Sequence, residues 1–241
     1  MLSGAKKNCY GAPMADLFLV SATLPGGGIG VFAVPAGTRG LVVRPYRVLD
    51  GSRSGDLDLG GATVPAAALL GGNEAAAPAI EAVVQRAIAA LSADAVGAMA
   101  TLVATTVEYA KTRVQFGQPI AKFQVIQHRL VQMKVAEEEA RASARLATLS
   151  LDGSAAQRVR AVSGAKAKVG RCARQVGQES IQIHGAIGTT DELPVGGYVK
   201  RLMAYEIMFG STRDHLRRYG ALIADPQLAA RGLLIDPVAA S

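Results

Sequence analysis

The chain has 241 residues, of which 50% are hydrophobic and only 5% are aromatic, and its formal net charge is +7. This length and apolar content allow a sizeable buried core and exclude a largely disordered chain. Lys and Arg are spread among acidic residues without a dense basic run, which argues against a nucleic-acid-binding surface. Small aliphatic residues dominate the apolar set, so closely packed helices are favoured over a β-sandwich.

The cysteines, histidines and apolar runs point to no special compartment. Cys9 and Cys172 stand far apart, outside any CxxC pattern, and are expected to be reduced thiols. His128, His184 and His215 have no partner at ligand spacing, so no metal site is predicted. A signal-type amino terminus and an uninterrupted apolar run of about eighteen residues are both missing. We therefore expect a cytoplasmic protein without membrane association.

The first third of the chain has the pattern of an antiparallel β region. Short β-rich runs at 17–22, 31–34 and 41–45 are separated by Gly and Pro. The glycine-rich stretch 25–30 precedes a strand and not a helix, so it predicts a hairpin turn and not a dinucleotide-binding loop. The composition then changes in GGNEAAAP at 71–78, which has the character of a linker. We place the boundary of the β region near residue 75.

Helical periodicity dominates the remainder. One long helix is expected over about 80–114, and a second begins at Phe123 and carries an apolar stripe on one face. Glu137 and Arg141 form an i,i+4 pair on the opposite, solvated face. The Asp-Gly-Ser turn at 152–154 breaks this helix and starts a third, which gives an antiparallel hairpin. Shorter helices are expected at 199–207 and 212–223, and the Pro-containing tail 224–241 is expected to be loosely held.

Three motifs remain after the elements are placed: RVQFGQPI at 113–120, QIHGAIG at 182–188 and MFGSTRDHL at 208–216. Glycine and proline in the first two are explained by helix ends. That explanation leaves Arg113 and Phe116 unaccounted for. An Arg fork suits phosphate oxygens, and an aromatic side chain suits a flat ring.

Taken together and in this order, the motifs resemble the carboxy-terminal half of the FAD-dependent acyl-CoA dehydrogenases. The resemblance implies an α+β protein, with a partial antiparallel β domain at 1–75 followed by a helical bundle of acyl-CoA dehydrogenase type at 76–223. The segment 2–22 resembles part of the family's middle domain. The family's amino-terminal helical domain has no counterpart in this sequence.

The resemblance also implies a set of FAD contacts, several of them made to the FAD of a neighbouring subunit. Arg113 would bind the pyrophosphate and Phe116 would lie against the nucleotide, while small residues in the second motif let backbone N–H groups approach phosphate. Ala186 stands where the family usually has a second glycine. The implied cofactor-binding residues are Arg113, Gln115, Phe116, Gln124, Gln182, Gly185, Ala186 and Ser211.

The sequence departs from the family at the catalytic position. The family's Glu-Gly-Thr triplet, whose carboxylate removes the substrate's α proton, is Phe209-Gly210-Ser211 here, and a phenyl ring cannot accept a proton. The region of the family's alternative base, near Ala87, has no carboxylate. Glu206 remains as a weak candidate for a displaced base, one helical turn before Phe209.

A second departure lies in the β region, where Asn8 and Tyr10 replace the Trp and Thr that the family often places against the flavin. Our interpretation is a FAD-contacting, shortened member or subunit of an acyl-CoA dehydrogenase. It would serve α,β-dehydrogenation of an acyl-CoA thioester within a homo- or hetero-oligomer, with the base supplied by a partner chain. The alternatives are a non-enzymatic helical oligomerisation module and a flavin-dependent monooxygenase, which needs no carboxylate at position 209.

Overall fold

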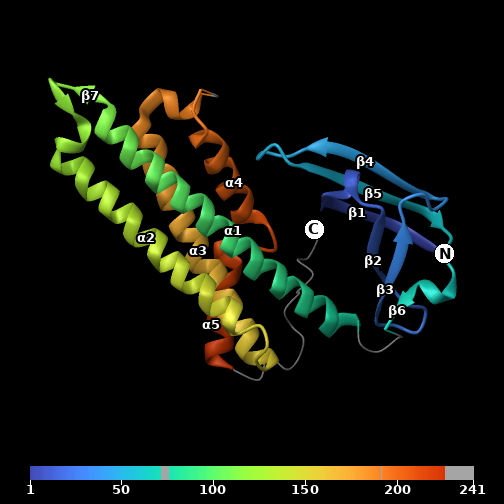
Figure 1. The fold of residues 1–241 in the computed structure, drawn as a ribbon. Coiled ribbons are helices and arrows are strands. Elements are labelled where there is room, and N and C mark those ends of the chain that lie inside the picture. Colours follow the sequence, from blue (N-terminus) through green and yellow to red (C-terminus); the bar gives the residue numbers. More distant parts are fainter. Residues whose placement is uncertain (72–75, 191, 226–241) are drawn as a thin grey trace. The chain divides into compact units, whose positions relative to one another are not determined.

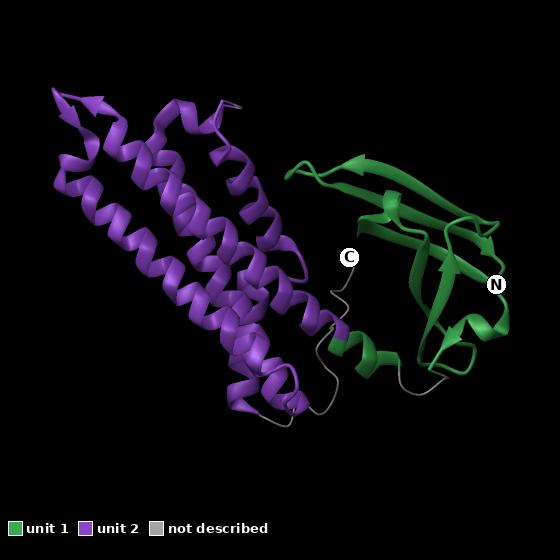
Figure 2. Ribbon diagram, viewed as in Figure 1, with its two compact units in different colours: residues 1–82 green, residues 83–241 purple. Residues whose placement is uncertain are grey.

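The computed structural model describes residues 1–71, 76–190 and 192–225. The chain divides into two compact units, residues 1–82 and 83–241 (Figure 2). The expected linker lies partly at 72–75 and most of the expected loose tail at 226–241, both outside the described residues.

The first unit contains two three-stranded antiparallel sheets (Figure 1). One has the order β1-β5-β4 and the other the order β2-β3-β6. Their inner faces share an apolar core that includes Phe18, Val20, Val34, Leu57 and Leu59. The strands are β1 (Leu2–Tyr10), β2 (Leu17–Thr23), β3 (Ile29–Pro35), β4 (Leu41–Arg47), β5 (Arg53–Ala62) and β6 (Leu69–Leu70).

The predicted hairpin turn is confirmed, because β2 and β3 pair directly across it and Gly27 and Gly28 have φ of 87° and 79°. Strand β5 was not predicted from the sequence. Its Asp and Gly content disfavours a strand, yet Leu57 and Leu59 alternate into the core while β1 and β4 pair with its two edges. Tertiary pairing overrides local propensity here.

The second part of the chain is a helical bundle (Figure 1). The predicted helices and the α2–α3 hairpin are confirmed, and Ser154 begins α3 with a capping box formed with Gln157. A common core of small aliphatic side chains joins α1, α2, α3 and α4. The helices are α1 (Ala76–Thr112), α2 (Gln124–Leu149), α3 (Ala155–His184), α4 (Val195–Ile207) and α5 (Thr212–Ala224).

Helix α1 is long and apolar enough, by length and composition, to cross a membrane, but half of its most apolar window is buried inside the protein. Its buried Met99, Leu102 and Ala110 belong to the bundle core. A core helix passes the same test as a membrane span, and we interpret α1 as a core helix of the bundle.

The face of α2 opposite the apolar stripe is less solvated than the sequence pattern indicated. The predicted Glu137–Arg141 pair is present, and Lys134 also binds this carboxylate. However, the Glu137 side chain is only 1% exposed, so the prediction of a solvated pair is wrong for Glu137. Two cations compensate for the cost of burying its charge.

The corner between α4 and α5 packs closely on α3 at Gly170. A Cβ atom at this position would lie 2.2 Å from Thr212 Oγ1 and 2.6 Å from Glu206 Oε2. Both distances are below 3.0 Å, so a side chain at this position would force Thr212 and Glu206 to shift.

We predict that Gly170→Ala destabilises the protein by about 1–3 kcal/mol, although alanine is the better helix former, because the added methyl group displaces Glu206 and Thr212. The matched control is Gly220→Ala on α5, where a Cβ meets nothing within 4 Å. That control should raise stability by up to about 1 kcal/mol. Urea unfolding compares the two, and equal stability of both variants would contradict the packing argument.

Candidate functional site

The first two motifs meet at one end of the helical bundle. Near the end of α1, Tyr109 stacks on His184 at the end of α3, with ring centroids 4.3 Å apart. The Tyr109 hydroxyl also donates a hydrogen bond of 3.3 Å to the His184 carbonyl oxygen. Arg113 and Gly185 follow these two residues within one helical turn. A buried contact between α1 and α3 therefore brings the two predicted cofactor motifs together.

The RVQFGQPI motif forms a short antiparallel hairpin of β7 (Val114–Gln115) and β8 (Gln118–Pro119). Its two turn residues, Phe116 and Gly117, have φ of 52° and 77°, the positive angles that a tight two-residue hairpin turn requires. The Phe116 ring is 92% exposed and meets Phe123 edge to face at 6.1 Å. The hairpin thus holds the Phe116 ring on the surface, where another molecule can contact it.

The polar side chains of this end are also directed to solvent. Arg113, Gln124 and Gln182 are exposed, and within the described residues the Arg113 guanidinium makes no hydrogen bond or ion pair. The Gln115 side chain only donates to the neighbouring Val114 carbonyl. These groups are available for an external partner.

The second motif ends α3. Gly185 has φ of 69° and ψ of −147°, a conformation that glycine adopts without strain. It opens a 3-10 turn, Gly185–Thr189, in which Ala186 is exposed. The predicted glycine helix stop is confirmed, and its exposed surface lies beside the Arg113 hairpin.

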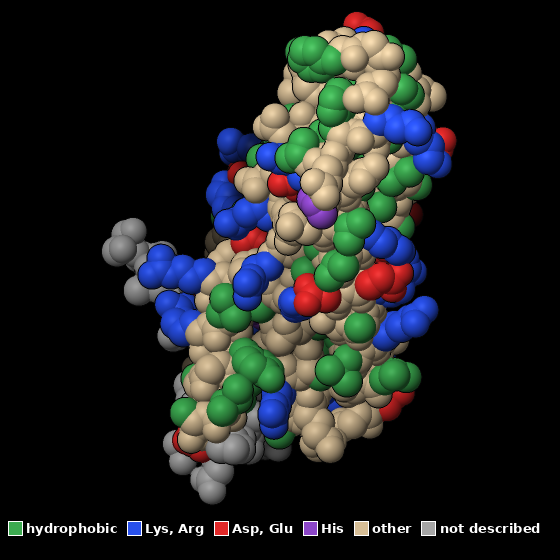
Figure 3. Space-filling view, turned by 90° about the vertical axis from the view of Figure 1, so that its left-hand side faces the viewer, with side chains coloured by type: hydrophobic (Ala, Val, Ile, Leu, Met, Phe, Trp, Pro, Cys, Tyr) green, Lys and Arg blue, Asp and Glu red, His purple; other side chains and the backbone are tan. Residues whose placement is uncertain are grey.

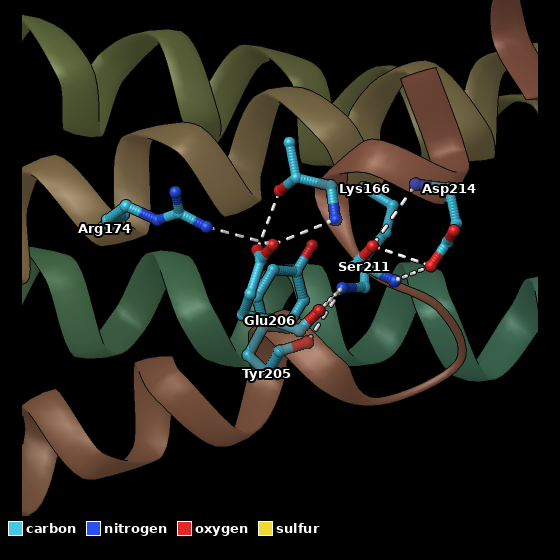
Figure 4. Close-up of polar contacts among 7 residues, drawn as sticks. Lys166, Arg174, Tyr205, Glu206, Ser211 and Asp214 are labelled. Carbon is cyan, nitrogen blue, oxygen red and sulfur yellow. Dashed lines mark hydrogen bonds and ion pairs between the residues drawn. The ribbon is translucent and has the colours of Figure 1, made fainter. Parts of the chain in front are cut away.

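The third motif forms the corner between α4 and α5 (Figure 4). Helix α4 ends at Ile207, and Phe209 follows with φ of 55° and a side chain that is 46% exposed. Its carbonyl oxygen accepts a hydrogen bond of 2.9 Å from His215 Nε2. A left-handed non-glycine residue costs about 1–2 kcal/mol, so the surrounding contacts must hold this conformation.

Ser211 caps the amino terminus of α5. Its hydroxyl donates to Asp214 Oδ2 at 2.6 Å, and Asp214 in turn accepts from the Ser211 backbone N–H at 3.0 Å. These bonds from Ser211 hold the pKa of the Asp214 carboxyl below its usual range. The hydroxyl predicted to contact flavin is therefore fixed in direction by a capping box.

The structure weakens the case for Glu206 as a displaced base. The helical spacing that placed it one turn from Phe209 does not hold, because α4 ends before Phe209. The Glu206 carboxylate accepts bonds from Thr212 N at 3.0 Å and Thr212 Oγ1 at 2.7 Å, and Arg174 pairs with it at 3.4 Å. Figure 4 shows this carboxylate directed to α3 and the start of α5. It serves as a cap for α5.

Lys166 lies under the same corner, fully buried on α3. Its Nζ donates to the carbonyl oxygens of Tyr205 at 2.8 Å and Glu206 at 3.2 Å, and it lies 4.2 Å from the centroid of the Tyr205 ring. Burial lowers the pKa of this ammonium to about 8, against the opposing effect of Glu206 and Asp214.

The α4–α5 corner lies far along α3 from the end of the bundle that carries the first two motifs. Gly170 touches the corner and Gly185 ends the helix, so fifteen residues at about 1.5 Å per residue place them about 22 Å apart. The structure therefore gathers seven of the eight predicted cofactor residues at one end and leaves Ser211 apart. Sequence reasoning missed Tyr109, His184, Lys166 and His215, although both histidines lie inside the motifs.

In the β unit, Asn8 and Tyr10 are engaged within the β1-β5-β4 sheet. Asn8 has φ of 52°, and its N–H bonds to Asp56 Oδ1, which also accepts from the Tyr46 hydroxyl. Lys7 and these donors lower the pKa of Asp56 to about 2. The Tyr10 hydroxyl donates to Ser52. The replacements thus belong to an internal polar network on this sheet.

We predict a pH effect from His215, which is 2% exposed and whose pKa is lowered to about 4, chiefly by burial. The unfolded chain takes up a proton near pH 6.5 and the folded chain does not until about pH 4, so stability falls as the pH drops between these values. The full loss is about 3 kcal/mol. Urea unfolding across this range should show a shallower loss for His215→Gln, which keeps an N–H donor.

The control is His128→Gln, which replaces an exposed histidine on α2. If His215→Gln and the wild type lose stability in parallel, His215 is not the residue responsible.

Comparison with known proteins identifies the fold and its relatives. The family model "Acyl-CoA dehydrogenase, C-terminal domain" matches residues 78–221. Acyl-CoA dehydrogenase FadE27 of Mycobacterium tuberculosis is 30% identical over 233 residues, which cover 93% of this chain and 61% of that protein. The chain therefore spans less than two thirds of the length of this relative.

Two solved structures are also similar. The crystal structure of the ChsE4-ChsE5 complex from Mycobacterium tuberculosis has a TM-score of 0.82 at 28% identity, covering 93% of this chain and 60% of that one. The structure of PigA with FAD and proline has a TM-score of 0.85 at 26% identity, covering 92% and 60%. With the family model matched over more than half of its length, this chain belongs to the acyl-CoA dehydrogenase family.

Proposed function

We propose that this chain is a FAD-contacting subunit of an acyl-CoA dehydrogenase, and that a partner chain supplies the catalytic carboxylate. One observation carries the proposal. The end of the bundle that carries the predicted cofactor residues exposes the Phe116 ring and the Arg113 side chain, whereas the corner that would present a base carries Phe209. The chain is thus equipped to contact a cofactor and lacks the group that would start the reaction.

The described residues fit FAD. Arg113 offers a guanidinium fork that has no partner among the described residues, which suits a pyrophosphate. Phe116 offers an exposed ring, which suits a nucleotide. Gln115, Gln124, Gln182, Gly185 and Ala186 would complete this contact surface. The relative PigA is solved with FAD, which supports FAD as the cofactor class. When bound, FAD supplies the acceptor for a hydride from the substrate's β carbon.

Separation of the two contact regions supports an assembly. About 22 Å of α3 lies between the Ser211 corner and the Gly185 end, so the two regions would serve different parts of a cofactor or different cofactors. The relative ChsE4-ChsE5 is described as a complex, which agrees with a hetero-oligomer. Such an assembly would let one chain provide the carboxylate and this chain provide nucleotide contacts.

The surface of the chain also favours association. Val125, Val131 and Val135 on α2 are each more than half exposed. Figure 3 shows hydrophobic side chains distributed over one face of the molecule, with Lys and Arg among them. We take the three exposed valines of α2 as part of the contact surface for another chain. We propose a homo- or hetero-oligomer in the cytosol, acting on an acyl-CoA thioester.

Within this proposal Phe209 leaves the proton on the substrate's α carbon. Glu206 cannot replace the base, because its carboxylate is held by Thr212 and Arg174. Ser211, fixed by Asp214, would orient its hydroxyl at the flavin end of the site. Two alternatives remain. A non-enzymatic oligomerisation module predicts that no flavin is bound, and a flavin-dependent monooxygenase predicts oxygen consumption with reduced flavin.

We predict that the purified chain alone does not dehydrogenate acyl-CoA, because loss of a general base costs about 100-fold to 10,000-fold in rate. Dye-linked turnover measured on the homogeneous chain, and on the chain co-purified with its partner, checks this. Activity should require the partner. Robust turnover by the chain alone that Glu206→Gln abolishes would instead establish Glu206 as the base.

A monomer in light scattering at micromolar concentration would contradict the proposed assembly.

We further predict that Arg113→Ala weakens FAD binding by the assembly roughly tenfold to a hundredfold, since a charge-assisted contact contributes about 1.5–3 kcal/mol. The control is Lys111→Ala, which removes a cation from the same last turn of α1, where Lys111 pairs with Glu108. FAD titration monitored by flavin fluorescence separates the two variants. Unchanged affinity in Arg113→Ala with slightly reduced thermal stability would mean that Arg113 only stabilises the end of α1.

A further inference from the structure

Lys166 is an unusual residue for the core of α3. Its side chain is the largest fully buried one among the described residues, and an isolated buried ammonium is costly. The carboxylates nearest to it are otherwise engaged: Glu206 caps α5 and Asp214 forms the capping box. Its direct partners are backbone carbonyl groups and the face of the Tyr205 ring. Pairing with a carboxylate is therefore not the whole reason for its burial.

The carbonyl groups that Lys166 binds belong to the last turn of α4. The final carbonyls of a helix have no partner inside the helix, and buried ones need an external donor. Tyr205 is only 3% exposed, so water has little access to its carbonyl oxygen as an alternative hydrogen-bond donor. From α3, the Lys166 ammonium donates hydrogen bonds to the carbonyl oxygens of Tyr205 and Glu206. These two residues lie four and three positions before Phe209 in the sequence.

The bonds around the corner act in sequence along the chain. Lys166 fixes the end of α4, His215 fixes the Phe209 carbonyl, and the Ser211 capping box fixes the start of α5. The last two are contacts within the corner and α5. Lys166 reaches the corner from a different helix and from within the core, so it sets the position of the corner on α3 (Figure 4).

We propose that Lys166 is a positioning residue of the flavin-end site: by holding the carbonyl groups of Tyr205 and Glu206 against α3, it fixes where the corner presents residue 209 and the Ser211 hydroxyl. This inference rests on the proposed function, in which the corner lies at the flavin end. Lys166 itself touches neither cofactor nor substrate, since it is buried. Its effect passes through the α4–α5 backbone.

The test uses Lys166→Met in the full chain, with Arg174→Met as the matched control. Methionine preserves the apolar part of the side chain and removes the donor, and replacing a buried charge by an apolar group is often tolerated. Arg174 is an exposed cation on the same helix that contacts the Glu206 carboxylate. Amide hydrogen exchange should become at least about tenfold faster at 208–214 in Lys166→Met, and change less than about threefold in the control. Exchange in the α2–α3 hairpin should stay unchanged.

A purely structural role gives a different pattern. Faster exchange throughout the bundle, without a selective change at the corner, would overturn the proposal, as would unchanged exchange at 208–214.

If Lys166→Met fails to fold, Lys166→Gln retains a donor and should give a smaller selective effect. If neither variant folds, ¹⁵N-lysine NMR of the wild type decides. One Nζ signal shielded from water exchange is expected, and its absence would refute the bonds to the carbonyls.

FAD titration of the assembled protein separates this inference from the proposed function. Selective loosening with at least about tenfold weaker FAD binding supports both. Selective loosening with unchanged FAD affinity overturns the positioning role at the flavin site. If the wild type binds no FAD with any partner, the proposed function fails, and with it the part of the inference that concerns flavin, whereas the exchange data still decide whether Lys166 positions the corner.

Discussion

The packing of the α4–α5 corner on α3 is the constraint on which the candidate site depends. It needs a residue without a side chain at Gly170, because the Glu206 and Thr212 side chains occupy the space of a methyl group. It also needs donors for the carbonyls at the end of α4, which Lys166 provides. Where two helix ends meet on a third helix, the unpaired backbone groups need hydrogen-bond partners and the side chains need room in the same small space.

The same helix connects the corner with the end of the bundle that carries the predicted cofactor residues. α3 runs from its cap at Ser154 to His184, and its last residue stacks on Tyr109 of α1. A rigid helix therefore fixes the spacing between the exposed Arg113 hairpin and the Ser211 hydroxyl. Two regions at a fixed separation along one rod are well suited to contacting an extended cofactor in an assembly of several chains.

The backbone at Phe209 is held in place by the contacts of the corner. Phe209 keeps a left-handed conformation that costs free energy, and His215 and the Ser211 capping box support it. In the proposed assembly, the corner would hold this geometry while a partner chain supplies the base. In the β unit, Asn8 is likewise held by contacts within its sheet, because Asp56 accepts bonds from the Asn8 N–H and from the Tyr46 hydroxyl.

The sequence by itself determined the helical elements, the β hairpin and the three motifs, because apolar periodicity and glycine positions are local signals along the chain. The family resemblance followed from those motifs. Strand β5 was decided by pairing with β1 and β4, since its Asp and Gly residues carry no strand signal. Only the tertiary structure could show that Glu206 caps α5, that Glu137 is buried and that Lys166 binds the end of α4. Each of these depends on which residues distant in sequence share a buried space, and the charge pattern along one helix cannot reveal that.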